Sequence, residues 1–230
     1  RKLLGKLSYK RIWQELILIL GEKDPVSSLE RMQEIGVWSY ILPEVDLSII
    51  KRTTLKRVPV VKAWWLGHYY KMDVRTWLIY VMVLLSQLEE EQVEQIVSRY
   101  SLDSYSQQAI RESRMVPGII EQLGRSEELP PSYIYNLIGT WHSESVIYLL
   151  LSLRDEQIWE AVTRYLDARD RVRVETNGHV LKAMGIKPGP IYSQILGELF
   201  RYRLDGLVTN QHEETSLVNQ WIKEGKYASV

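Results

Sequence analysis

The residues best suited to binding chemistry lie near the C-terminus, in the segment GHVLKAMGIKPGP at residues 178–190. Gly185 is predicted to end one helix in the left-handed conformation, and Pro190 to open the next helix after a KPGP turn. The unpaired amides at a helix start attract anions, and Gly189 would let a ligand approach the backbone closely. The segment is therefore a candidate phosphate site, although a purely structural corner between two helices has the same requirements.

Basic residues surround this turn and form three further clusters. Lys plus Arg and Asp plus Glu both number 29, so the net charge is zero and only an uneven distribution could favour nucleic acid. Residues 1–11 and 51–62 contain basic residues and no acid, whereas residues 164–173 mix both signs. Any one cluster could be a solvated helix face, but three favour a phosphate-binding surface. The candidate residues for binding nucleic acid are Lys182, Lys187, Gly189, Arg201, Arg203, Arg169, Arg171, Arg173, Lys6 and Lys10.

No catalytic or metal-binding constellation is apparent. The chain has no Cys, and it lacks the phosphate-binding, serine-hydrolase and zinc-protease motifs as well as a D-x-D pair for two metal ions. The four histidines are scattered, so each is interpreted as a structural or surface residue. We therefore predict no catalytic residue and no metal site in this chain.

Aromatic residues are concentrated beside the basic run 51–62. Trp64-Trp65 and Tyr69-Tyr70 lie within the segment VVKAWWLGHYY. Aromatic rings next to Lys and Arg can stack on bases, but the same segment has the pattern of a buried helix. The pattern favours a role in the core.

Apolar spacing is helical along nearly the whole chain, and no alternating run with a hairpin turn is present. The sequence therefore predicts an all-α fold of ten or eleven helices, with an irregular multi-helix body and a small helical tail. No repeat of fixed length was found, which argues against a solenoid. Asp24 and Pro25 are predicted to cap and open one of the helices.

The longest apolar run, residues 77–85, is far shorter than the about 20 residues that span a bilayer. With no signal peptide recognised, a cytoplasmic location is predicted. The chain opens with Arg1 in place of an initiator Met, which is typical of a processed protein or a fragment.

Two long segments resemble a known family. GHVLKAMGIKPGPIYSQILGELFRYRLDGLVTNQHEE resembles the C-terminal segment of bacterial tRNA nucleotidyltransferases and poly(A) polymerases, and LSYKRIWQELILILGEKDPVSSLERMQEIGVWSYILPEVD resembles the stretch after their catalytic head and neck. Lys10 departs from the Glu that the family often has there. The middle, about residues 50–175, resembles the family only in being helical.

The resemblance implies a body at residues 1–174 and a tail at residues 175–230. In the family these parts hold the acceptor and TΨC half of tRNA while a separate head adds nucleotides. The head motifs and the neck motif that selects CTP or ATP are absent here. The resemblance therefore implies a chain that is inactive alone, whose parent uses Mg²⁺ and ATP or CTP in that head. Whether the parent adds CCA, CC, A or poly(A) stays open.

A second hypothesis is a helical protein–protein interaction or dimerisation module of a multidomain protein. Both hypotheses leave room for a homo-oligomer.

Overall fold

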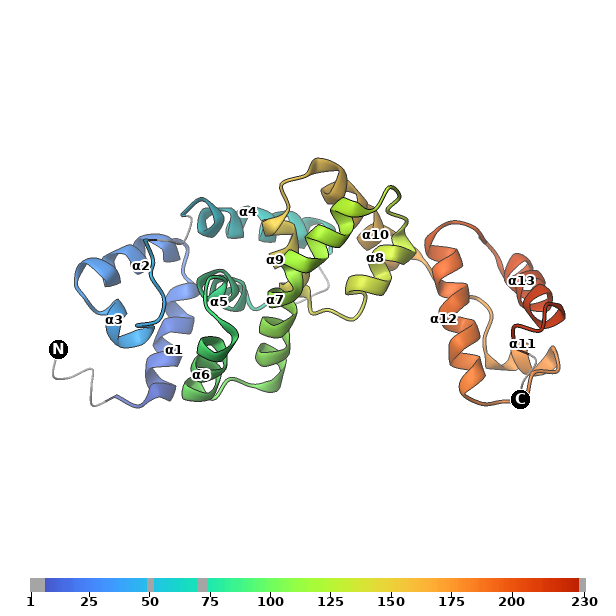
Figure 1. The fold of residues 1–230 in the computed structure, drawn as a ribbon, viewed down its shortest axis with the longest axis horizontal. Helices are drawn as coiled ribbons and strands as arrows, with labels where there is room; N and C mark the ends of the chain where they lie inside the picture. Colours follow the sequence, from blue (N-terminus) through green and yellow to red (C-terminus); the bar gives the residue numbers. More distant parts are fainter. Residues whose placement is uncertain (1–6, 49–51, 70–73, 228–230) are drawn as a thin grey trace. The chain divides into compact units, whose positions relative to one another are not determined.

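A computed structural model describes residues 7–48, 52–69 and 74–227 (Figure 1). Within these residues the chain forms thirteen α-helices and no strand, so the prediction of an all-α fold is confirmed. The number exceeds the expected ten or eleven partly because some helices are very short. Helix α3 has four residues and α11 has six, too few for a periodic pattern to reveal.

The chain divides into two compact units. Unit 1 comprises residues 1–122 and 141–154, and unit 2 comprises residues 123–140 and 155–230. Unit 1 contains α1 (Tyr9–Leu20), α2 (Pro25–Glu34), α3 (Trp38–Ile41), α4 (Arg52–His68), α5 (Thr76–Leu85), α6 (Glu90–Tyr100), most of α7 (Ser104–Arg125) and α9 (Ser143–Ser152).

Helix α5 forms the centre of unit 1. Every residue from Leu78 to Leu85 is buried. A helix that is apolar all round must be covered on all sides, and α5 packs against α1, α4 and α9. The apolar run 77–85 is thus a core helix. Among the described residues, no helix has the length and apolar character needed to cross a membrane.

Two buried carboxylates connect the helices of unit 1. Glu144 accepts hydrogen bonds from the Arg75 backbone N–H at 2.8 Å and from the Tyr105 hydroxyl at 2.6 Å. Glu112 accepts from the backbone N–H of His142 at 2.9 Å, and its Oε1 lies 2.9 Å from His142 Nδ1. Burying a carboxylate without hydrogen-bond partners would lower the stability of the fold, and these contacts supply the partners. They also give His142 a structural role.

Unit 1 contains the helix start predicted at Asp24 and Pro25 and the aromatic residues predicted to lie in the core. Asp24 caps α2 by accepting from the Ser27 backbone N–H at 3.3 Å, and Pro25 is the first residue of that helix, as predicted. Trp65 is fully buried and Tyr69 nearly so, which confirms their role in the core. Tyr70 lies outside the described residues.

Unit 2 contains the end of α7 and five further helices. These are α8 (Pro131–Ile138), α10 (Glu156–Arg171), α11 (Gly178–Ala183), α12 (Pro190–Leu204) and α13 (Gln211–Lys223). Helices α8, α10 and α12 pack on one another. Helices α11, α12 and α13 share a core cluster formed by Leu181, Ile191, Ile195, Leu199, Val218 and Trp221. The predicted domain boundary between residues 174 and 175 stays a prediction.

Burial of α5 gives a test of the unit 1 core. Leu78→Ala should lower the free energy of unfolding by about 2–5 kcal/mol, because it leaves a cavity on a fully buried face. The matched change Leu18→Ala removes a side chain that is 66% exposed and should alter stability by about 0.5 kcal/mol or less. Urea unfolding of the two variants measures the difference, and equal effects would contradict a core built around α5.

Candidate RNA-binding surface

Helix α11, which leads into the junction with α12, is fixed by hydrogen bonds at both of its ends. Asn177 caps α11, and its Oδ1 accepts from the backbone N–H of His179 at 2.9 Å. At the other end Gly185 adopts φ 85°, and its N–H donates to the Lys182 carbonyl at 3.0 Å. The Ile186 N–H donates to the Leu181 carbonyl at 3.2 Å, which completes a Schellman motif. The predicted left-handed end at Gly185 is confirmed.

The turn that follows is held against α12. The Tyr192 hydroxyl donates to the Ile186 carbonyl at 2.9 Å, and Pro190 is the first residue of α12, as predicted. Gly189 caps this helix in an extended conformation at φ 171°. A Cβ on Gly189 would meet nothing within 4 Å. Internal packing therefore does not require a glycine at this position, and the space beside the backbone is open.

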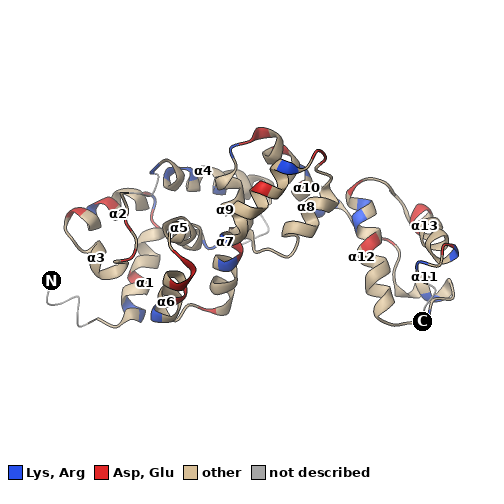
Figure 2. Ribbon diagram, viewed as in Figure 1, with Lys and Arg blue, Asp and Glu red and all other residues tan. Residues whose placement is uncertain are grey.

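Lys182 and Lys187 are the available cations at this junction. Both are exposed, and no hydrogen bond or ion pair within the described residues engages either side chain. Lys182 lies in the last turn of α11, and Lys187 lies two residues beyond Gly185. Figure 2 colours the basic residues of this unit, which include Lys182 in α11 and Arg201 and Arg203 at the C-terminal end of α12. The fixed backbone thus presents two unpaired ammonium groups beside an open glycine.

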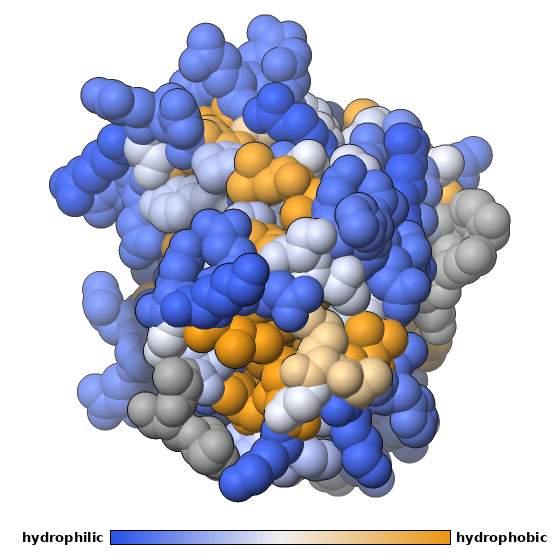
Figure 3. Space-filling model, turned by 90° about the vertical axis from the view of Figure 1, so that its right-hand side faces the viewer, coloured by the Kyte–Doolittle hydropathy of each residue, from blue (hydrophilic) through white to orange (hydrophobic). Residues whose placement is uncertain are grey.

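The surface around the tail is mixed in polarity. Figure 3, which views the molecule from the side of α11–α13, shows an apolar area bordered by hydrophilic side chains. Met184, Ile186 and Leu217 are partly buried hydrophobic residues packed on the tail core. Because apolar side chains interrupt this face, attraction for phosphate there must come from individual cations.

Arg203, another candidate RNA ligand, is committed to internal partners. Its side chain is only 10% exposed, and its Nε donates to Glu214 while its Nη2 pairs with Glu175 at 2.8 Å. Its Nη1 also donates to the Thr209 carbonyl. With its guanidinium group engaged on three sides, Arg203 has a structural role in this conformation.

Glu214 is the fully buried partner in this network. Besides Arg203, it accepts from the backbone N–H of Glu175 at 3.2 Å and of Thr176 at 2.6 Å. Burial alone would raise the pKa of this carboxyl, but the hydrogen bonds from Thr176 and Arg203 outweigh it and hold the pKa below its ordinary value of 4.5. The start of the tail, α12 and α13 therefore meet at one charged carboxylate.

The basic residues at the end of α10 have varied surroundings. The Arg169 guanidinium lies 5.7 Å from the centre of the Tyr165 ring, and Arg173 Nη1 donates to the Val172 carbonyl at 2.7 Å. Arg171 lines an open groove of about 540 Å³ along α10. Arg164 lines the same groove with Glu160 and Asp167, so two basic and two acidic side chains balance one another.

The remaining candidates lie apart from the junction. Arg201 donates from Nε to Asn136 Oδ1 at 3.0 Å and is otherwise exposed near the end of α12. Lys10 is exposed in the first turn of α1, and neither it nor the neighbouring Arg11 has an ion pair within the described residues. Lys6 lies outside the described residues. The structure thus brings Lys182, Lys187 and Gly189 together, and the RNA contacts of all the candidates stay predictions.

The sequence analysis did not identify Glu214, which decides the role of Arg203. The available signal was the acidic start of the last helix, NQHEE, where two carboxylates follow a capping Asn210. Only one of the two, Glu214, points into the protein and is fully buried. Nothing in the local sequence distinguishes it from Glu213.

Comparisons with known proteins point to one family. Residues 1–48 match a family model described as the probable RNA and SrmB-binding site of polymerase A. Over 216 residues the chain is 27% identical to an A-adding tRNA nucleotidyltransferase of Geobacter sulfurreducens, covering 92% of this chain and 24% of that protein. It is 21% identical to the A-adding enzyme of Halalkalibacterium halodurans, covering 95% of this chain and 48% of that protein.

A solved structure agrees over the whole fold. The chain superposes on the Thermotoga maritima CCA-adding enzyme complexed with tRNA-CCA with a TM-score of 0.77 and 24% identity, covering 95% of this chain and 53% of that one. Over nearly its whole length the chain is similar to tRNA nucleotidyltransferases. It spans between about a quarter and half of the length of these relatives. The similarity to this family includes the middle of the chain, which sequence motifs alone left undecided.

The buried carboxylate gives a test of how the tail is held. Glu214→Gln should destabilise the tail by about 3 kcal/mol, because it leaves Arg203 without one of its charged partners in a buried place. Asn219→Ala, an exposed change on the same helix, should have little effect. Urea-dependent hydrogen exchange of the α13 amides measures both.

The Glu214→Gln variant should also change how the stability of the tail depends on pH. Because folding lowers the pKa of Glu214, its stabilising contribution is complete above 4.5 and is lost as the pH falls through the lower folded-state value. The tail of the Gln variant should lose less stability than the wild type over this range. An identical pH dependence in the two proteins would contradict a charged Glu214.

Proposed function

We propose that this chain is the tRNA-binding part of a tRNA 3′-end nucleotidyltransferase. It would hold the acceptor and TΨC half of tRNA so that the 3′ end reaches a catalytic head outside these residues. The observation that carries the proposal is the α11–α12 junction, where Lys182 and Lys187 are unpaired beside the open backbone of Gly189. The likeness to a CCA-adding enzyme complexed with tRNA supports it.

Phosphate contact suits the chemistry of this junction. Two ammonium groups and the amides at the start of α12 attract a phosphodiester backbone, and an open glycine allows close approach. Double-stranded RNA is recognised mainly by shape and by contacts to phosphates and 2′-hydroxyls. A rigid junction can therefore fix the position of an RNA helix without distinguishing one base from another.

The internal pairing of Arg203 narrows the set of residues that would contact RNA. In the tail that contact would fall on Lys182 and Lys187, with Arg201 able to contribute if it leaves Asn136. In unit 1 the exposed Lys10 and Arg11 lie within the segment that matches the RNA-binding family model. Each unit would thus supply its own cations to one long RNA partner.

Nucleotide addition would be the task of the missing head. In that arrangement Mg²⁺ and ATP or CTP act in the head, and the tRNA-binding part determines which RNA is presented to it. The chain spans about half of the CCA-adding enzyme, which leaves length for such a head in the relative. The residues that choose CCA, CC, A or poly(A) would also lie there.

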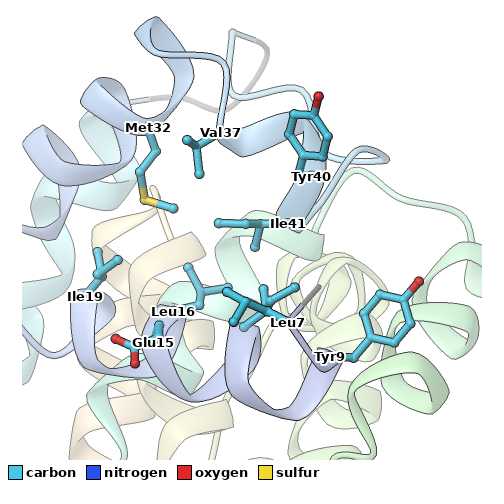
Figure 4. A pocket seen from close by; sticks show the side chains of 10 residues that line it. Leu7, Tyr9, Glu15, Leu16, Ile19, Met32, Val37, Tyr40 and Ile41 are labelled. Atoms are coloured by element: carbon cyan, nitrogen blue, oxygen red, sulfur yellow. The ribbon is translucent and has the colours of Figure 1, made fainter. Parts of the chain in front are cut away.

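A protein-interaction module is the second candidate function. One observation favours it, an open apolar groove of about 510 Å³ beside α1. This groove (Figure 4) belongs to unit 1, whereas the α11–α12 junction belongs to unit 2.

Removal of the two lysines tests the RNA proposal. Lys182→Ala/Lys187→Ala should weaken tRNA binding and reduce the slope of log affinity against log salt by about 2, because each phosphate that is no longer neutralised lowers that slope by about one. Filter binding of tRNA across a salt series measures both quantities.

The control removes the same charge where it is already neutralised. Arg111 pairs with Glu94 at 3.7 Å and Arg114 with Glu90 at 3.0 Å, so Arg111→Ala/Arg114→Ala should leave the salt slope nearly unchanged. A lysine variant with the wild-type slope would rule out phosphate contact at this junction.

A further inference from the structure

The chain passes between unit 1 and unit 2 three times, and one of these passages lies inside a helix. Two fall in short loops, at residues 139–142 and 153–155, whose backbone torsions can absorb a movement. The third lies within α7, between Gln122 and Leu123. A continuous helix is the stiffest of these connections, so the stiffness of α7 decides how freely the two units can change their mutual orientation.

The part of α7 just before this passage departs from regular helix chemistry. Pro117 has no backbone N–H, so the hydrogen bond that its position would donate to the Ser113 carbonyl cannot form. The Ser113 hydroxyl donates to the Ile110 carbonyl at 2.7 Å, a back-bond of the kind that often bends helices. Gly118 follows Pro117 directly. Sharp bends in helices occur at proline and at glycine–serine positions, and all three residue types are present here.

Packing does not require a glycine at position 118. Gly118 is exposed, and a Cβ built on it would meet nothing within 4 Å. Alanine would therefore fit at this position and would favour the helical conformation. Glycine instead keeps a wide range of backbone torsions next to the residue that already lacks its helix bond.

A small cavity lies beside the same part of α7. Its volume is about 140 Å³, and Ser113 and Pro117 are among the α7 residues that line it. Leu85 and Ser86 at the end of α5 and Tyr148 on α9 line it as well. Closely packed helices resist bending because their side chains have no room to move. The cavity gives this side of α7 room to change its curvature without a clash.

We propose that α7 is a hinge that bends at residues 113–118 and lets unit 2 change its orientation to unit 1. The missing backbone bond, the glycine and the cavity lie at neighbouring positions, shortly before the helix passes between the units. The two loops at the other passages follow the movement. One consequence rests on the proposed function: a tRNA that contacts both units would hold the hinge in a single setting.

Paired spin labels measure the movement, because the chain has no Cys and can be labelled at chosen positions. The cross-unit pair is Val60→Cys/Asn219→Cys, which joins an exposed site on α4 to one on α13. The unit 1 pair is Leu18→Cys/Val60→Cys, and both of its sites are exposed. Electron–electron resonance on the 230-residue chain without RNA should give a broad distance distribution for the cross-unit pair and a narrow one for the unit 1 pair.

Restoring ordinary helix chemistry should stiffen α7. Pro117→Ala/Gly118→Ala supplies the missing N–H and a residue that favours the helix, so the cross-unit distribution should narrow and the populations at its edges should fall about fivefold or more. The matched control is Gly124→Ala, the same glycine change in the last turn of α7, where a Cβ also meets nothing within 4 Å. Gly124 does not line the cavity, and this control should leave the distribution nearly unchanged.

Two results without RNA would overturn the hinge. The first is a cross-unit distribution as narrow as that of the unit 1 pair. The second is a broad distribution that Pro117→Ala/Gly118→Ala leaves unchanged, which would assign the movement to the two loops.

A measurement with saturating tRNA tests the consequence for RNA binding. The cross-unit distribution of the chain with its native α7 should narrow. If tRNA binds in a filter assay and the distribution stays broad, the coupling of the hinge to RNA is wrong. If tRNA does not bind at all, the proposed function fails, and the measurements without RNA still decide whether α7 is a hinge.

Discussion

The buried carboxylate of Glu214 is the interaction on which the tail depends. A charged group that is fully removed from water must be completely paired, and Glu214 achieves this with Arg203 and the backbone N–H groups of Glu175 and Thr176. These partners come from the start of the tail and from α12, while Glu214 itself belongs to α13. The segment before α11, the C-terminal end of α12 and helix α13 are therefore tied together at one point.

The same pairing divides the basic residues into two groups. Arg203 stabilises the fold, whereas Lys182 and Lys187 have no internal partner within the described residues and are free to meet a ligand. The proposed role needs both a rigid backbone and unpaired lysine side chains. A contact that recognises the shape of an RNA helix works only if its cations are held in place. The likeness to a CCA-adding enzyme complexed with tRNA supports tRNA as the proposed partner of this surface.

Local features could be predicted from the sequence because their causes are local. Gly185 ends α11 in the left-handed region and Asp24 caps α2, and each depends on neighbours a few residues away. The apolar run of α5 could be recognised as too short for a membrane span, but its place at the centre of unit 1 required the structure. The role of Arg203 could not be predicted, because its partners Glu175 and Glu214 are 28 and 11 residues away and only folding brings them together. The groove beside α1 was missed for a similar reason: it exists only where two helices leave a gap.

The central claim is that tRNA phosphates lie against the α11–α12 junction. The most direct measurement is the rate at which an amine-specific reagent labels each lysine, read by mass spectrometry with and without saturating tRNA. The account predicts strong protection of Lys182 and Lys187, and unchanged labelling of Lys226, whose amine already pairs with Glu198. Unchanged labelling of Lys182 and Lys187 while tRNA is bound would contradict it.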